Sequence, residues 1–215
     1  MNERRYQDRA EAGRALAQEL TSIPTENTVV YGLARGGVPV AAVVASELGC
    51  PLDALLVRKI GAPGNPELAL GAITSYGGMT VNERVASGMN VSRDEIDRLA
   101  QKEREEAKTQ ERSIRGDNPA VSPEGRTVIL VDDGLATGAS MAAAVQAMRE
   151  AAAARIIVAV PVASSQARDR VARLADEVHC LSTPASFSAV GQWYADFGQV
   201  SNDAVRRLIQ SHPNG

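Results

Sequence analysis

The chain has 215 residues, a formal net charge of −3 at pH 7 and a sequence pI of about 5.5. Its length predicts either one domain of about 150 residues with an appendage or one large α/β domain, with a sizeable core. We expect a single domain over residues 1–215. The acidic balance, with no run of Lys or Arg apart from neighbouring acids, argues against nucleic acid as a partner.

The N-terminus and the cysteines narrow the class of protein further. The N-terminal residues are charged and contain no apolar stretch, which predicts neither a signal peptide nor a membrane anchor. We therefore expect a cytoplasmic protein without a membrane partner. Cys50 and Cys180 lie far apart and lack metal-binding spacing, so both are predicted to be small core residues.

Helical and strand patterns alternate along the first part of the chain, as in a parallel sheet covered by helices. Apolar residues at three- and four-residue spacing predict an amphipathic helix over residues 5–20. A strand over 28–33, a helix over 38–48 and a strand over 53–58 then form a βαβ unit.

Residues 61–90 change character, because Pro and Gly repeatedly interrupt short apolar pieces. This composition predicts a mobile loop or a small hairpin excursion. Ser92 and Glu95 form a capping box that opens a charge-rich helix to about residue 115. We expect residues 61–115 to form an insertion made of a lid loop and this helix. The helix has a narrow apolar stripe at Ile96, Leu99, Ala107 and Ile114, which is compatible with a homodimer.

After a connector rich in Pro and Gly, the alternation resumes. The predicted elements are a strand over 127–132, a helix over 139–154, a strand over 155–160, a helix over 165–174 and a strand over 177–181. The whole pattern predicts five parallel strands with flanking helices, followed by a C-terminal part over residues 182–215 that contains a helix. The loops after Leu33, Arg58 and Val131 should converge on one face, where ligands bind in such sheets.

The segment from Val128 to Ser140 reads VILVDDGLATGAS and is the most informative part of the chain about function. A buried strand ends in Asp132 and Asp133, and a turn rich in Gly and hydroxyls leads into a helix. Amides at a helix N-terminus attract phosphate, whereas the two acids suit sugar hydroxyls or a cation. The pattern indicates a sugar-phosphate site, with an ordinary acidic turn as the alternative. Its spacing fits neither a Walker loop nor a dinucleotide fingerprint, and a phosphatase would have its acids separated by one residue.

This motif resembles the phosphoribosyl-pyrophosphate (PRPP) motif of type I phosphoribosyltransferases. The resemblance implies the parallel-sheet fold of that family and transfer of a phosphoribosyl group from PRPP to a nucleobase or related small acceptor, with release of pyrophosphate. It implies Mg²⁺ as cofactor, bridged mainly by substrate and in part by Asp132 and Asp133. The acid pair would hold the ribose 2′ and 3′ hydroxyls during catalysis. The implied 5′-phosphate loop consists of Gly134, Leu135, Ala136, Thr137, Gly138, Ala139 and Ser140.

A second strand-to-helix loop contains Ala34, Arg35, Gly36 and Gly37. Its glycines allow successive backbone amides to point at one anion, and the guanidinium of Arg35 can bind two phosphate oxygens at once. The resemblance assigns this loop to pyrophosphate. Tight helix packing is the alternative reason for the glycines.

Cations also follow the next predicted strand. Arg58 and Lys59 would neutralise the leaving pyrophosphate as catalytic groups, with solvated surface cations as the alternative. Residues 61–90 would exclude water as a lid. Glu67 is the candidate catalytic acid on this segment, with an ordinary solvated Glu as the alternative.

Aromatic residues are scarce, with one Trp, four Tyr and two Phe in the whole chain. Phe187, Trp193, Tyr194 and Phe197 fall within one short segment. The resemblance implies a variable hood over the acceptor there, so Phe187, Trp193 and Tyr194 are candidate acceptor contacts. The alternative is that these rings pin the C-terminal helix onto the core.

The residue before the Thr-Gly of the phosphate loop is Ala136. The family's 6-oxopurine enzymes typically have aspartate there, which weakens a hypoxanthine or guanine assignment. Alanine resembles adenine and uracil enzymes, although Asp133 stands where uracil enzymes usually have proline. A non-catalytic regulatory protein that binds PRPP or a nucleotide is the alternative to an enzyme. Arg35, Arg58 and Lys59 favour the enzyme, because a sensor needs no neutralisation of a leaving group.

Overall fold

The computed structural model describes residues 5–116 and 118–212, apart from the side chains of Pro66 and Glu67. Its seven strands form one sheet in the order β4-β3-β2-β1-β5-β6-β7. The parallel part contains β1 (Thr28–Ala34), β2 (Leu52–Ala62), β5 (Thr127–Val131), β6 (Arg155–Val160) and β7 (Glu177–Cys180). The antiparallel part contains β3 (Asn65–Thr74) and β4 (Met79–Val81). The prediction of five parallel strands is confirmed.

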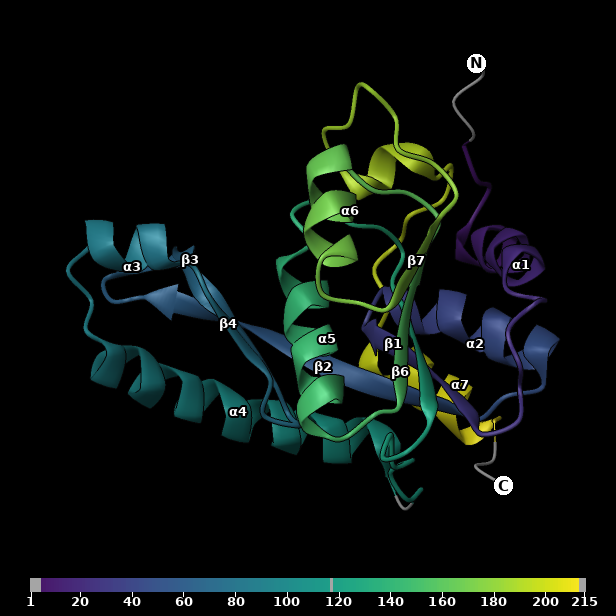
Figure 1. Ribbon diagram of the computed structural model, residues 1–215, viewed down its shortest axis with the longest axis horizontal. Helices are drawn as coiled ribbons and strands as arrows, with labels where there is room; N and C mark the ends of the chain where they lie inside the picture. Colours follow the sequence, from purple (N-terminus) through teal and green to yellow (C-terminus); the bar gives the residue numbers. More distant parts are fainter. Residues whose placement is uncertain (1–4, 117, 213–215) are drawn as a thin grey trace.

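Helices cover both faces of the parallel strands (Figure 1). One face packs against α5 (Ala139–Glu150) and α6 (Ser165–Ala172), and the other against α1 (Arg9–Glu19), α2 (Gly37–Leu48) and α7 (Asn202–Gln210). The strands are rich in Val and Ile because both of their faces are buried. Neighbouring residues of β5 show this, since Ile129 packs in the core with α2 and Leu130 packs in the core with α5. The predicted α/β class is confirmed.

The start of α1 differs from the sequence prediction. The helix begins at Arg9 rather than at residue 5, because the Asp8 side chain accepts a hydrogen bond from the Glu11 amide and caps the helix there. Tyr6, which the apolar spacing places in the helix, instead pairs with Tyr194 in an isolated parallel bridge. This long-range pairing ties the N-terminal segment to the hood.

The alanine-rich end of α5 is the second difference. Helix propensity predicts a helix to residue 154, but α5 ends at Glu150. Ala152 has a φ of 59°, and the amide of Ala154 donates to the carbonyl of Arg126. The chain turns here because β6 must pair with β5, and this long-range pairing outweighs the local propensity of the alanines.

Residues 61–115 form an arm that extends away from the parallel strands, to the left in Figure 1. The arm contains the end of β2, then β3, β4, α3 (Glu83–Gly88) and α4 (Arg93–Arg115). A small core of its own is made of Ile60, Ala62, Leu70, Ile73, Ala86, Ile96 and Ala100. Residues 61–90 are therefore a hairpin followed by a short helix rather than an open loop. The side chain of Glu67 lies outside the described residues.

The apolar stripe of α4 packs within its own chain. Ile96 lies in the core of the arm, whereas Ala107 and Ile114 pack in the core with α2. Ser92 caps the helix by accepting a hydrogen bond from the Glu95 amide, as the capping-box pattern predicts. Because these apolar side chains are covered by the same chain, the stripe gives no support to the predicted homodimer.

A buried ion pair, the Asp53–Arg115 anchor, fixes the end of α4 to β2. The Asp53 side chain is 1% exposed and accepts hydrogen bonds from Nη2 of Arg115 at 2.9 and 3.0 Å. It also accepts a hydrogen bond from the amide of Val121 at 2.9 Å. Arg115 forms a second ion pair, with Glu111, at 2.7 Å. Tyr31 donates to the carbonyl of Val121. The anchor thus holds both α4 and the connector after it against the sheet.

Both cysteines are free thiols. Cys50 lies in the core with α2, and Cys180 packs half-buried at the end of β7. Among the helices of the described residues, none combines the length and the apolar character needed to cross a bilayer.

Candidate functional site

A pocket of about 350 Å³ lies at the carboxyl ends of β1 and β5, beside Val57 in the middle of β2. This strand-end pocket is lined by Arg9, Leu33, Ala34, Arg35, Gly36, Val57, Asp132, Asp133, Ser140, Gln199 and Val200. The loops after β1 and β5 meet here because the carboxyl ends of parallel strands share one edge of the sheet. The pocket therefore brings together the acid pair, Arg35 and part of the predicted phosphate loop.

The two acids have different surroundings. Asp132 is half-buried, and its Oδ1 accepts the Asp133 amide at 2.9 Å. Asp133 is 9% exposed, and its Oδ2 accepts a hydrogen bond from Nε of Arg9 at 2.9 Å and forms an ion pair with Nη2 of Arg9 at 2.8 Å. Burial and the adjacent charge of Asp133 raise the pKa of Asp132 well above its ordinary value. Burial also raises the pKa of Asp133, although the Arg9 guanidinium opposes that shift.

Gly36 and Gly37 let the loop after β1 lie directly against the acid pair. A Cβ on Gly36 would overlap Oδ2 of Asp133, and a Cβ on Gly37 would lie 2.6 Å from the carbonyl oxygen of Val131. Side chains at these positions would push the two loops apart. Close packing therefore explains the glycines, and it also places Arg35 on the same pocket wall as the acids.

The end of the predicted phosphate loop forms the start of α5. Gly138 has a left-handed φ of 72° and is the N-cap, so the first amides of α5 point outward at the positive end of the helix dipole. Ala136, Thr137 and Ser140 are exposed, and Ala139 is half-buried. This part of the loop can receive an anion.

The first two residues of the predicted loop are engaged by the protein. The Leu135 amide donates to the carbonyl of Val162 at 2.9 Å. A Cβ on Gly134 would lie 2.7 Å from the side chain of Val190, so this glycine permits close contact with the hood. The outward-facing part of the loop is therefore shorter than the predicted residues 134–140.

Arg58 and Lys59 line a second pocket of about 560 Å³ between β2 and α4. Arg35 lines both pockets, which adjoin at its loop. The Nε and Nη2 atoms of Arg58 contact Glu103 and Glu106 of α4 at 2.7 and 2.5 Å. The structure thus directs Arg58 toward the arm, whereas Arg35 lines both pockets.

The predicted hood aromatics pack against the N-terminal segment. Trp193 is 6% exposed and Tyr194 is 1% exposed, and both lie in a cluster with Tyr6. Phe187 stacks on Trp193 with ring centroids 6.5 Å apart. The rings of Trp193 and Tyr194 are covered by protein, so they offer no open platform for an acceptor. The cluster holds the hood to α1 rather than to the C-terminal helix, which corrects the alternative interpretation as well.

Three residues that no local sequence pattern marks also line the strand-end pocket: Arg9, Gln199 and Val200. Arg9 lies 124 positions from its partner Asp133, and no local pattern links the two. The aromatic cluster just before Gln199 was the one signal available, because it marks the segment that folds over this edge of the sheet.

The comparison with known sequences agrees with this geometry. A family model described as a phosphoribosyl transferase domain matches residues 5–196. A protein of Mycobacterium tuberculosis (strain CDC 1551 / Oshkosh), provisionally named as a phosphoribosyl transferase, is 44% identical over 200 residues. The alignment covers 93% of this chain and 45% of that protein, so the chain spans about half the length of this curated relative.

Two solved structures share the architecture. TT1426 from Thermus thermophilus is 42% identical, with a TM-score of 0.84 over 98% of this chain and 100% of that chain. A Neisseria gonorrhoeae protein solved with bound ppGpp has a TM-score of 0.50 and 12% identity over 98% of both chains, which shows a common fold alone. The sheet order, the acid pair at the end of β5 and the family match over most of the chain lead to one conclusion: the chain belongs to the phosphoribosyl transferase domain family, with the type I fold.

Proposed function

We propose that the chain transfers the phosphoribosyl group of PRPP to a nucleobase or related small acceptor and releases pyrophosphate. The strand-end pocket carries this proposal, because it combines an acid pair, Arg35 and the N-terminus of α5. PRPP has anions at both ends and sugar hydroxyls between them. The order of cationic loop, carboxylates and helix N-terminus is complementary to that pattern of charge.

Each part of the pocket has a role in this reaction. The first amides of α5, with Thr137 and Ser140, would bind the 5′-phosphate. Arg35 and the amides of the loop after β1 would bind the pyrophosphate. Asp132 would accept a hydrogen bond from a ribose hydroxyl, and its charge would stabilise the positive charge that develops on the anomeric carbon. The bond from C1′ to pyrophosphate breaks as the acceptor nitrogen bonds to C1′, and the proton of that nitrogen is released to the departing pyrophosphate or to solvent, so no protein nucleophile is needed.

The acid pair fits a magnesium ion that the substrate holds in large part. Among the described residues, no group of three or more His, Cys, Asp or Glu side chains is placed to hold a metal. Mg²⁺ prefers oxygen ligands and is commonly bound by one or two carboxylates together with substrate phosphates. Asp132 and Asp133 would be its protein ligands, and the ion would neutralise charge on the pyrophosphate.

The second pocket adjoins the first on the pyrophosphate side. Arg58, Lys59 and Lys102 line it, and Arg35 connects it to the strand-end pocket. We assign to it the route by which pyrophosphate leaves. In this assignment the arm forms the outer wall and limits the access of water to the activated sugar.

Incubation with PRPP, Mg²⁺ and a panel of nucleobases tests the activity. We expect pyrophosphate release that depends on one base and on Mg²⁺. Saturable PRPP binding without turnover on any base, amine or alkyl acceptor would instead identify a non-catalytic regulatory protein. If PRPP does not bind at all, the transferase and the PRPP-binding regulatory protein are both excluded.

Gly36→Ala tests whether the acids must lie close to the loop after β1. Gly36 has a φ of −63°, so alanine meets no backbone restriction, but its methyl group must displace the Asp133 carboxylate. We expect the affinity for ribose 5-phosphate, measured by calorimetry, to fall about tenfold, which corresponds to about 1.4 kcal/mol. Gly88→Ala is the matched control, because a Cβ there meets no atom within 4 Å. Unchanged affinity of Gly36→Ala would contradict the assigned role of this close packing.

A further inference from the structure

Arg9 connects distant parts of the chain at the strand-end pocket. Its Nε donates to Oδ2 of Asp133 at 2.9 Å, its Nη2 forms an ion pair with the same oxygen at 2.8 Å, and its Nη1 donates to the carbonyl of Gly198 at 2.9 Å. The guanidinium carbon lies 4.0 Å from the centroid of the Phe197 ring. The side chain is 13% exposed and lines the pocket. One side chain therefore contacts both the acid pair and the start of residues 197–200.

The contacts of Arg9 belong to a closed circuit that runs through Phe197, Tyr194 and Asp133. Phe197 stacks on Tyr194 with ring centroids 5.0 Å apart, and the Tyr194 hydroxyl donates to the carbonyl of Asp133 at 2.6 Å. Tyr194 is 1% exposed and fixed, whereas Phe197 is 37% exposed. Since Gln199 and Val200 directly follow Gly198 and line the pocket, Arg9 sets the position of this wall relative to Asp133.

We propose that Arg9 is a positioning residue that couples Asp133, on the ribose side of the strand-end pocket, to an acceptor-side wall formed by residues 197–200. This inference rests on the proposed function, because residues 197–200 can meet an acceptor only if the chain transfers a phosphoribosyl group. A ribosyl phosphate that fixes Asp133 also fixes the guanidinium, and the guanidinium then orders the wall. Binding of PRPP thereby prepares the surface that meets the acceptor.

Lysine cannot perform this coupling. The planar guanidinium donates to a carboxylate and a carbonyl while its face lies on an aromatic ring. An ammonium group is a single point of charge and cannot hold all three partners at once. Arg9→Lys therefore keeps the charge beside Asp133 and removes the geometry that links it to Gly198 and Phe197.

Two measurements on Arg9→Lys test the inference. The first is PRPP affinity by calorimetry, which we expect to fall about tenfold. The second is amide hydrogen exchange of residues 197–200, which PRPP should slow in the wild type and leave unchanged in Arg9→Lys. With a working acceptor, the KM for that acceptor should rise by a larger factor than kcat falls, because the wall and not the reacting centre is disturbed.

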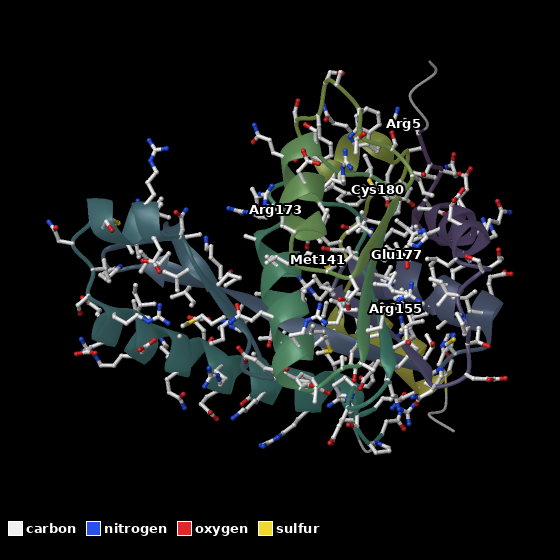
Figure 2. All side chains as sticks on the ribbon, in the orientation of Figure 1. Arg5, Met141, Arg155, Arg173, Glu177 and Cys180 are labelled. Carbon is white, nitrogen blue, oxygen red and sulfur yellow. The ribbon has the colours of Figure 1, made fainter. Side chains whose placement is uncertain are left out.

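Arg5→Lys is the matched control. Arg5 belongs to the same N-terminal segment (Figure 2) and donates to the carbonyl of Tyr194 at 3.2 and 3.0 Å, so it ties this segment to the hood without contacting Asp133. We expect its PRPP affinity and its PRPP-dependent exchange to match the wild type. Equal losses in Arg5→Lys and Arg9→Lys would show a general tether and overturn the inference, as would wild-type behaviour of Arg9→Lys.

Failure of the inference and failure of the proposed function are distinguishable. If the wild type binds no PRPP, the proposed function is wrong. The role of Arg9 in positioning the wall is then tested by amide hydrogen exchange of residues 197–200 in the ligand-free protein. Arg9→Lys must speed exchange at residues 197–200, and Phe197→Leu, which changes a partly exposed ring, must do the same without unfolding the protein. Unchanged exchange in both variants would overturn the inference.

Discussion

Asp132→Asn is expected to abolish most of the phosphoribosyl transfer and to stabilise the fold. Turnover should fall at least about 100-fold, because the amide lacks the charge that opposes the positive charge developing at the anomeric carbon. The Asn side-chain oxygen can still accept the Asp133 amide, so the local backbone keeps its hydrogen bond. Loss of activity together with gain of stability would identify Asp132 as a residue kept for function at a cost in stability.

The stabilisation has a defined pH dependence. Burial and the charge of Asp133 raise the pKa of Asp132, so the folded state binds its proton more tightly than the unfolded state does. Stability of the wild type therefore falls as pH rises through the interval above the ordinary Asp pKa. Asp132→Asn removes this penalty, so we expect the variant to be more stable than the wild type at pH 7 and equally stable near pH 3.

Denaturant unfolding at pH 7 and near pH 3 measures this effect. Asp169→Asn is the control, because Asp169 is exposed on α6 and pairs with the exposed Arg168. We expect its free energy of unfolding to change by less than about 0.5 kcal/mol. A variant Asp132→Asn that is less stable than the wild type at pH 7 would show that burial of this carboxylate is not net unfavourable.

Asp53→Ala is expected to give the largest loss of stability, about 3–5 kcal/mol. The substitution leaves the Arg115 guanidinium, 12% exposed, without its main partner and the buried amide of Val121 without its acceptor. Glu111 still contacts Arg115 at 2.7 Å, which favours the lower end of that range. Hydrogen exchange should speed first at the end of α4 and in the following connector, because the anchor fixes both.

A double substitution separates charge burial from packing. Asp53→Ala with Arg115→Met should recover part of the lost stability, because it removes the unpaired charge and keeps an apolar side chain of similar length. Lys108→Ala, which breaks the exposed pair with Glu105 on the same helix, should change the free energy of unfolding by less than about 0.5 kcal/mol. If Asp53→Ala and Lys108→Ala have similar effects, the anchor is not what holds the arm.

The sequence predicts structure best where the signal is local. The apolar runs before Asp132 and around Val30 mark buried strands, and the serine caps mark where helices begin. Alternation of these elements implies a parallel sheet, and a parallel sheet places its strand-end loops on one edge. Arg35, Gly36, Asp132 and Ser140 therefore meet in one pocket, as the order of elements along the chain required.

The sequence by itself determined the fold class, the strand-end pocket and the acid pair within it. Only the tertiary structure decided which residues surround that pair: Arg9 reaches Asp133 from the first turn of α1, Arg58 turns toward α4, and Trp193 is buried in the hood. The physical reason is that helix caps and strand patterns depend on near neighbours along the chain. Ion pairs, covered rings and close approaches at glycine depend on which distant segments pack together, and no local pattern encodes that.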